Sequence, residues 1–161
     1  MRSQFSNAGG VCGFSQILSL LLRSSVATTQ EKALRLIGNL CQIPANQPLL
    51  LRTNLTLILL GLMKSPKSEP NIVKLSCWVL ACLSSHESNK ELIMQADGFS
   101  YLLPLLLGDN SIAEQAFTVI TNMVNTRNSE LHKSFRAAGG LAVVVDVLLS
   151  DSSPHKTNVL R

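Results

Sequence analysis

The side chains best suited to chemistry in this sequence are three histidines and four cysteines, and their spacing decides what that chemistry can be. The histidines, His86, His132 and His155, lie far apart, and none stands beside an acid and a nucleophile in a recognisable motif. Hydrolysis or group transfer needs a nucleophile, a base and a group that orients the base. The sequence therefore predicts solvated surface histidines in a protein that is not an enzyme.

The cysteines are poorly spaced for a metal site. Cys12, Cys41, Cys77 and Cys82 contain no C-x-x-C pair, whereas zinc sites usually combine paired ligands at short spacing with a nearby histidine. Cys41 and Cys82 instead lie at or next to apolar positions of a repeating pattern. We expect small buried thiols in a reducing compartment, with no metal and no cofactor.

Three other function classes are disfavoured. Gly9, Gly10 and Gly13 do not make a phosphate loop, because no strand precedes them and no G-K-[ST] follows. Lys and Arg are scattered singly in a chain of formal charge +4, so no nucleic-acid partner is expected. The longest apolar run, at residues 55–63, falls short of the roughly 18–20 residues that a membrane span needs. Without a secretory signal in the first ten residues, we expect a cytoplasmic protein, with the nucleus, centrosome or cilium as alternatives, that is not secreted.

The elements that must carry these side chains are helices. Hydrophobic residues make up 46% of the chain and aromatic residues only 4%, a composition that suits close-packed helices. One apolar helical face comprises Phe99, Leu102, Leu103, Leu106 and Leu107. The next helix shows the same spacing in Ala116, Val119, Ile120, Met123 and Val124. Two such helices cannot bury their apolar faces alone, so they need neighbours of the same kind.

The pattern returns along the whole sequence. The residues before each predicted leading helix are Gly13, Asn54, Gly98 and Gly140, at intervals of 41, 44 and 42. Apolar residues follow each of them at positions one, four, five, eight and nine. Anchors in the following helix are Ala33, Ser76 and Ala116, at intervals of 43 and 40. We predict one domain over 1–161, with units of about 42 residues at about 1–47, 48–90, 91–130 and 131–161, the first and last incomplete.

Each unit is expected to hold a short helix followed by two longer ones. The short helix fits residues 91–96 and 131–138, and fits 49–53 less well. Capping boxes at Thr28-x-x-Glu31, Ser88-x-x-Glu91 and Ser111-x-x-Glu114 are expected to open helices. Pro104, inside a leucine run, is expected to kink or restart its helix.

These features resemble armadillo repeats, which have a short helix ending in A-G-G or A-D-G and a third helix carrying N-L. The matching pieces are Ala8-Gly9-Gly10, Ala96-Asp97-Gly98, Ala138-Gly139-Gly140, Asn39-Leu40 and Asn122-Met123. HEAT repeats, which use two helices, are the close alternative. The resemblance implies an all-α, right-handed α-solenoid of about 3.5 repeats, whose third helices line a concave groove.

In armadillo proteins that groove takes extended peptides, often through a ladder of Trp and Asn four residues apart. The aligned pairs here are Arg35 with Asn39, Trp78 with Cys82, and Thr118 with Asn122, so no unit has both. The candidate partner-binding residues are Lys32, Arg35, Asn39, Lys74, Trp78 and Asn122. The asparagines would bond a peptide backbone, the tryptophan would offer an aromatic platform and the cations would favour acidic groups. Three alternatives stay open: asparagines that bond neighbouring loops, a tryptophan buried between repeats, and an ordinary solvated basic face.

The sequence thus predicts a non-enzymatic interaction scaffold or adaptor that binds a protein or an extended, acidic peptide along the groove. The alternative is a structural assembly unit of a larger scaffold, for example at centrosomes or cilia, that works by repeat stacking or self-association. Solenoids need terminal repeats with a polar outer face, and neither end of this sequence supplies one. We therefore expect a fragment or short isoform of a longer repeat protein, or a chain that self-associates through uncapped ends.

Overall fold

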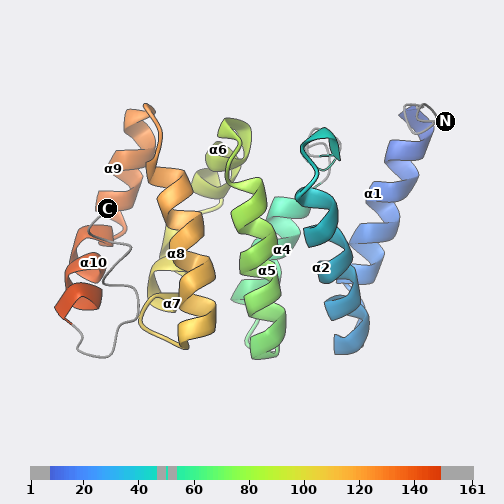
Figure 1. Cartoon of the computed structure of the whole chain (residues 1–161), viewed down its shortest axis with the longest axis horizontal. Coiled ribbons are helices and arrows are strands. Elements are labelled where there is room, and N and C mark those ends of the chain that lie inside the picture. Colours follow the sequence, from blue (N-terminus) through green and yellow to red (C-terminus); the bar gives the residue numbers. More distant parts are fainter. Residues whose placement is uncertain (1–7, 47–49, 51–53, 150–161) are drawn as a thin grey trace.

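The structure, a computed structural model, describes residues 8–46, 50 and 54–149, and every regular element within them is helical (Figure 1). The all-α prediction is therefore confirmed. The elements are α1 (Ala8–Leu22), α2 (Ala27–Cys41), the 3-10 helix η1 (Pro44–Asn46), α4 (Leu55–Lys64), α5 (Pro70–Leu83), α6 (Glu87–Gln95), α7 (Gly98–Leu105), α8 (Asn110–Val124), α9 (Ser129–Ala137) and α10 (Gly140–Leu149).

Apart from α6 and α9, the α-helices form two rows, which we call the front row (α2, α5 and α8) and the back row (α1, α4, α7 and α10) (Figure 1). Helix α7 has eight residues and α6 has nine, so the prediction that two longer helices follow the short one was wrong in this unit. Within the front row α5 packs against both α2 and α8. Each front-row helix also packs on the back-row helix that precedes it: α2 on α1, α5 on α4, and α8 on α7. The short helices α6 and α9 lie at one edge, against α7 and α10 respectively. The chain is thus a stack of similar helical layers.

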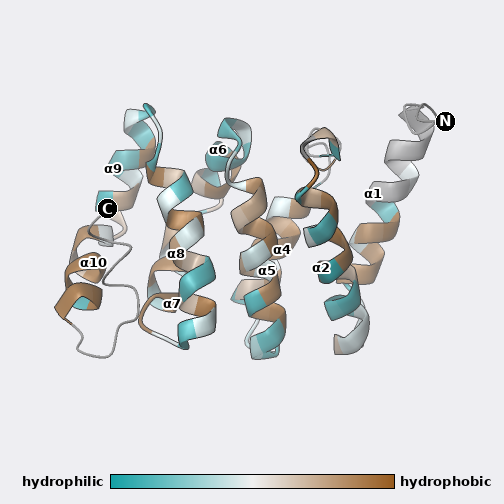
Figure 2. Cartoon of the chain, viewed as in Figure 1, coloured by the Kyte–Doolittle hydropathy of each residue, from teal (hydrophilic) through white to brown (hydrophobic). Residues whose placement is uncertain are grey.

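The core lies between the two rows, and aliphatic side chains fill it. Leu34, Leu80 and Met123 of the front row are completely buried, and Leu59 of the back row is as well. Phe99 of α7 is also buried, and its ring meets that of Phe135 edge-on at a centroid distance of 5.4 Å. In Figure 2 the ribbons of α2, α5 and α8 carry hydrophilic residues (teal) among hydrophobic ones (brown). Burying one leucine side chain contributes roughly 1.5–3 kcal/mol, so the inter-row contacts hold the stack together.

Two of the repeated glycines are needed because the short helices cross close over the start of the back-row helices. A Cβ atom at Gly98 would lie 2.3 Å from Ile93 Cγ2 and 2.7 Å from the Ile93 carbonyl oxygen. A Cβ atom at Gly140 would lie 2.3 Å from the ring of Phe135. Ile93 and Phe135 are 42 residues apart, as are the two glycines, so the same crossing occurs in both units. The glycine spacing in the sequence therefore reflects a real packing constraint.

The predicted starts of α1 and α2 were wrong. Helix α1 begins at Ala8 and runs through Gly13, which was expected to precede the helix. A Cβ atom at Gly13 would meet nothing within 4 Å, so the crossing that requires Gly98 has no counterpart there among the described residues. Helix α2 begins after Val26, whose backbone N–H donates to Ser24 Oγ at 3.1 Å. This turn opens the helix two residues before the proposed cap at Thr28.

Two further capping predictions were also wrong. The Asp109 carboxylate accepts hydrogen bonds from the Ser111 backbone N–H at 2.8 Å and from its hydroxyl at 2.6 Å, so Asp109 caps α8 and Ser111 does not. Both bonds go to the same carboxylate oxygen, Oδ1, and aspartate is a favoured residue at the start of a helix. Helix α6 begins after His86, and no side chain caps it. The predicted short helix at 49–53 lies outside the described residues, except Leu50, which is helical and buried.

Helix α7 contains Pro104 and ends one residue later, at Leu105, so the helix does not restart at the proline. The following amides make tighter bonds three residues back, from Leu107 to the Pro104 carbonyl and from Gly108 to the Leu105 carbonyl, both at 3.3 Å. The tightened turn keeps Leu106 buried but leaves Leu107 58% exposed. The prediction that Leu107 belongs to the apolar face of this helix was therefore wrong.

The hydroxyl of Ser76 is buried without a hydrogen-bond partner within the described structure. Ser76 stands where the other units have Ala33 and Ala116, both buried. An unpaired buried hydroxyl costs about 1–3 kcal/mol, and alanine is the better helix former. We expect Ser76→Ala to raise the free energy of unfolding by about 1 kcal/mol in urea denaturation. A loss of stability of similar size would mean that the hydroxyl has a partner after all.

Candidate partner-binding face

All six candidate residues lie on the front row, but they differ in how far they are exposed. Those on α2, namely Lys32, Arg35 and Asn39, are exposed. Those on the next two helices are half-buried: Lys74 and Trp78 on α5, and Asn122 on α8. The structure therefore groups the three exposed residues on a single helix, and it places the other three at or near the contacts between helices.

Trp78 packs between α5 and α2. A Cβ atom at Gly38 would lie 2.0 Å from Cζ3 and 2.3 Å from Cη2 of the indole, so the ring rests directly on the Gly38 backbone. In the next pair of helices, Thr118 corresponds to Trp78 and Ala81 corresponds to Gly38. There the smaller threonine side chain lies opposite alanine, which is larger than glycine. The large indole needs the missing side chain of Gly38. Trp78 thus has a packing role between units, while the part of it that is not buried adjoins the front face.

This contact predicts strong coupling between positions 38 and 78. Gly38→Ala would overpack the contact and lower the free energy of unfolding by about 1–3 kcal/mol. The better helix propensity of alanine would offset about 1 kcal/mol of this loss. In a Trp78→Ala background the same Gly38→Ala change should be neutral or stabilising, because the indole is gone. Urea denaturation of the four proteins should therefore give a coupling energy of at least about 1 kcal/mol. Additive effects would mean that the indole moves aside without cost.

Asn122 ties α8 to the end of α5. Its Nδ2 group donates to the Ala81 carbonyl oxygen at 3.1 Å and to Ser84 Oγ at 3.0 Å. The Ser84 hydroxyl is itself bonded to the Ala81 carbonyl at 2.8 Å. Both amide protons are used in this network, so the geometry agrees with the internal role that the sequence left as an alternative. Any contact of Asn122 with a partner would have to use its side-chain oxygen.

On α2, the residues equivalent to the helix-contacting residues of α5 and α8 are exposed. Leu36 is 49% exposed, whereas its counterparts Val79 and Val119 are fully buried. Asn39, the counterpart of Asn122, is exposed as well. The cause is that α2 covers this side of α5, and α5 covers this side of α8, while no helix in the described part of the chain packs on the same side of α2.

Four residues at helical spacing make up this uncovered surface, which we call the α2 stripe: Lys32, Arg35, Leu36 and Asn39. Residues spaced by three, four and seven positions share one helix face. Leu36 was not among the sequence candidates, because its alignment with two core valines hid its exposure. Only the knowledge that no helix among the described residues packs on this side of α2 could have identified it.

Lys74 has a different electrostatic setting. The pKa of the Asp109 carboxyl is lowered, first by its hydrogen bonds from Ser111 and to a smaller extent by the charge of Lys74. Lys74 is half-buried, so it is a weaker candidate for binding an acidic partner than the exposed Lys32 or Arg35.

Cys41 and Cys77 are buried, as expected, whereas Cys82 is only half-buried. Burial raises the pKa of Cys41 to about 12, with a smaller contribution from Cys82, and it raises the pKa of Cys77 to about 12. Burial also raises the pKa of Cys82. These thiols stay protonated at neutral pH, and the thiolate is the reactive form. Among the described residues no group of three or more His, Cys, Asp or Glu could hold a metal ion.

Comparisons with known proteins show a similarity of fold alone. Neither the models of known protein families nor the curated protein sequences match this chain. Three engineered proteins solved by the Northeast Structural Genomics Consortium are similar in structure: targets OR329, OR366 and OR497, with TM-scores of 0.78, 0.76 and 0.77 and sequence identities of 24%, 20% and 25%. The matches cover 91%, 86% and 86% of this chain but only 57%, 57% and 34% of theirs. They support a helical, repeat-like arrangement.

None of the helices in residues 8–46 and 54–149 is both long and apolar enough to cross a membrane.

Proposed function

We propose that this chain is a non-enzymatic protein-interaction module of the armadillo type, which holds an acidic partner segment on the α2 stripe and the adjoining front face. In this proposal α2, α5 and α8 are the third helices of a right-handed α-solenoid of about 3.5 units, and they line its concave groove. The short helices α6 and α9 favour three-helix units over the two-helix units of HEAT repeats. The proposed location is the cytoplasm, with the nucleus, centrosome or cilium as alternatives.

Equivalent side chains make equivalent contacts in successive units, which supports a tandem repeat. Asn46 and Asn89 both lie 13 residues past their anchors. The Asn46 side chain donates to the Leu40 carbonyl at 3.2 Å, and the Asn89 side chain donates to the Leu83 carbonyl at 2.9 Å. Each closes the last turn of a front-row helix, in the way that orphan helix carbonyls are commonly satisfied.

The observation that carries the proposal is the chemistry of the α2 stripe. The Arg35 guanidinium can bind a carboxylate through two parallel hydrogen bonds, and Lys32 adds a second positive charge beside it. Leu36 offers apolar surface of the kind that Val79 and Val119 bury in other units. Asn39 can donate to a backbone carbonyl, as Asn122 does to Ala81. A negatively charged, partly apolar protein segment satisfies all three kinds of group.

Quantitative affinity capture from a cell extract, comparing wild type with two charge-reversed variants, tests the proposal. The test variant is Lys32→Glu with Arg35→Glu, and the matched control is Arg127→Glu with Arg136→Glu, two exposed residues outside the front row. We expect the test variant to lose the captured protein and the control to retain it, with unchanged circular dichroism in both. Equal capture by the two variants, or equal loss, would contradict the proposal.

A second candidate function, a structural assembly unit, is favoured by the surface of α10. Leu141 and Val145 are 59% and 51% exposed, whereas their counterparts Phe99 and Leu103 are 1% and 2% exposed. The counterparts are buried because α8 covers α7, and within the described residues no front-row helix covers α10. An apolar face of this kind could stack on other repeats or on a second copy of the chain.

Light scattering coupled to size-exclusion chromatography tests this second function. If stacking occurs through α10, wild type should form oligomers that increase with concentration, and Leu141→Ser with Val145→Ser should abolish them. A wild-type protein that remains monomeric over the whole concentration range would exclude self-association.

A further inference from the structure

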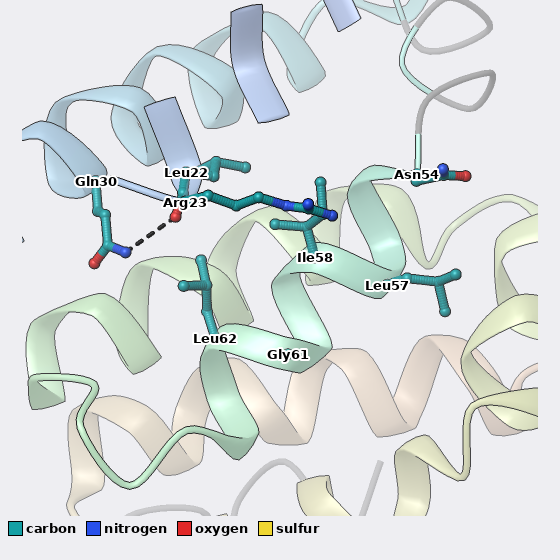
Figure 3. A pocket seen from close by; sticks show the side chains of 8 residues that line it. All are labelled: Leu22, Arg23, Gln30, Asn54, Leu57, Ile58, Gly61 and Leu62. Atoms are coloured by element: carbon teal, nitrogen blue, oxygen red, sulfur yellow. Dashed lines mark hydrogen bonds between the residues drawn. The ribbon is translucent and has the colours of Figure 1, made fainter. Parts of the chain in front are cut away.

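A hollow of about 490 Å³ opens between the end of α1, the start of α2 and the outer side of α4 (Figure 3). It shares no residue with the α2 stripe. Its volume falls within the range of small-ligand sites, roughly 300–1,000 Å³. The residues that line it are Leu22, Arg23, Gln30, Asn54, Leu57, Ile58, Gly61 and Leu62.

The hollow lies over Gly61 of α4, which has no side chain to fill it. Gly61 stands seven residues after its anchor, and the other units have Leu20, Leu105 and Val147 at that position. Val147 is buried and Leu105 is half-buried, whereas Leu20 is 71% exposed, so an aliphatic side chain at this place packs into the fold in the two later units only. At Gly61, by contrast, a Cβ atom would meet nothing within 4 Å. The space over Gly61 can therefore take an aliphatic side chain from outside.

The rim of the hollow carries one cation and two side-chain amides. Figure 3 shows Arg23 reaching from the end of α1 towards Ile58 of α4. The ion pairs found in the described part of the chain are Lys90–Glu87 and Lys133–Glu130, so neither uses Arg23.

The two amides have unused capacity for hydrogen bonds. Gln30 uses its Nε2 group to donate to the Leu22 carbonyl at 3.0 Å, which leaves its Oε1 atom able to accept. Asn54 precedes α4, but its side chain makes no capping hydrogen bond, and the residue is exposed. Peptide backbone, which offers a donor and an acceptor at nearly every residue, matches such a pair of amides.

We infer that this hollow binds an extended peptide segment in which an aliphatic side chain is followed directly by a carboxylate. The aliphatic side chain fills the space over Gly61, and the carboxylate pairs with the guanidinium of Arg23. Figure 3 places Gln30 and Asn54 at opposite ends of the lining, so their amides hydrogen-bond the peptide backbone on either side of this pair of residues. The site is separate from the α2 stripe, so it stands or falls independently of the proposed function.

The test is a titration of the isotope-labelled chain, followed by two-dimensional NMR, with the acetylated and amidated peptide Gly-Leu-Asp-Gly as the probe. Two control peptides replace the Asp by Asn or the Leu by Ala. We expect the probe to shift the amide resonances of Arg23 and Gly61, and each control peptide to bind about tenfold more weakly, which corresponds to one lost contact. Equal binding of all three peptides, or shifts confined to Arg35 and Asn39, would overturn the inference.

Two variants complete the experiment. Gly61→Leu should fill the hollow from within and abolish the shifts at Arg23, while Arg23→Gln should weaken binding about tenfold. Both should melt within a few degrees of wild type, because the first enters open space and the second changes an exposed side chain. Undiminished binding by Gly61→Leu would overturn the inference. So would unfolding of this variant, because it would show that other parts of the chain already occupy the space.

Discussion

Leu106→Asp is expected to unfold the chain, whereas Leu107→Asp, one residue further on, is expected to leave it folded. Leu106 is 6% exposed and packs in the core, so an aspartate there would bury an unpaired charge. The buried charge costs about 3–5 kcal/mol and the lost packing of the leucine side chain about 2–5 kcal/mol more, which together reach the roughly 5–15 kcal/mol by which a domain is stable. Leu107 is 58% exposed, and an aspartate there stays in water. Ile120→Asp, at a 4% exposed position on α8, should behave like Leu106→Asp.

Far-UV circular dichroism and urea denaturation separate these outcomes directly. The helical signal at 25 °C should fall sharply for Leu106→Asp and Ile120→Asp and stay near the wild-type value for Leu107→Asp. If Leu106 and Leu107 proved equally sensitive, α7 would have to continue beyond Leu105, and the tightened turn after Pro104 would be wrong.

Gly98→Ala should give the second-largest effect, a loss of about 2–3 kcal/mol. Its new methyl group would lie within 2.7 Å of the Ile93 carbonyl oxygen, a backbone atom that cannot swing away as a side chain can. Gly98 is the first residue of α7, so the gain in helix propensity is small at this position. The short helix α6 would have to move away from α7, and thermal or urea denaturation should show the loss.

Gly61→Ala is the matched control, because it makes the same chemical change inside α4 with open space around the new methyl group. It should raise the free energy of unfolding by about 0.5–1 kcal/mol, through the better helix propensity of alanine. Opposite signs at Gly98 and Gly61 are therefore expected. A loss at both positions would mean that α4 has a close neighbour over Gly61.

The sequence predicted the helices well where each unit has neighbours on both sides. The spacing of Gly98 and Gly140 predicted real crossings, because Ile93 and Phe135 lie over them in the same way. The prediction failed at Gly13, which has the right spacing but nothing lying over it, so the helix runs straight through. A glycine pattern shows where a crossing is possible, but only the packed structure shows whether it occurs.

The candidate site was only partly predictable, for a related reason. Arg35 and Asn39 were selected because they align with the ladder positions of the armadillo groove. The same alignment placed Leu36 in the core, although it is 49% exposed. The identity of a residue determines what it can bond, while its exposure depends on which helices lie beside it. The hollow over Gly61 was missed because the sequence pattern marks the side chains that are present, and here the decisive feature is one that is absent.

The most direct measurement of the central claim is NMR mapping of a captured acidic partner segment on the isotope-labelled chain. Trp78 is the only tryptophan, so its indole resonance is assigned without ambiguity and reports on the α2–α5 contact next to the stripe. Binding at the proposed face should shift the resonances of Lys32, Arg35, Leu36 and Asn39 together with the Trp78 indole. Shifts confined to α9 and α10, with the α2 stripe and Trp78 unmoved, would contradict the account.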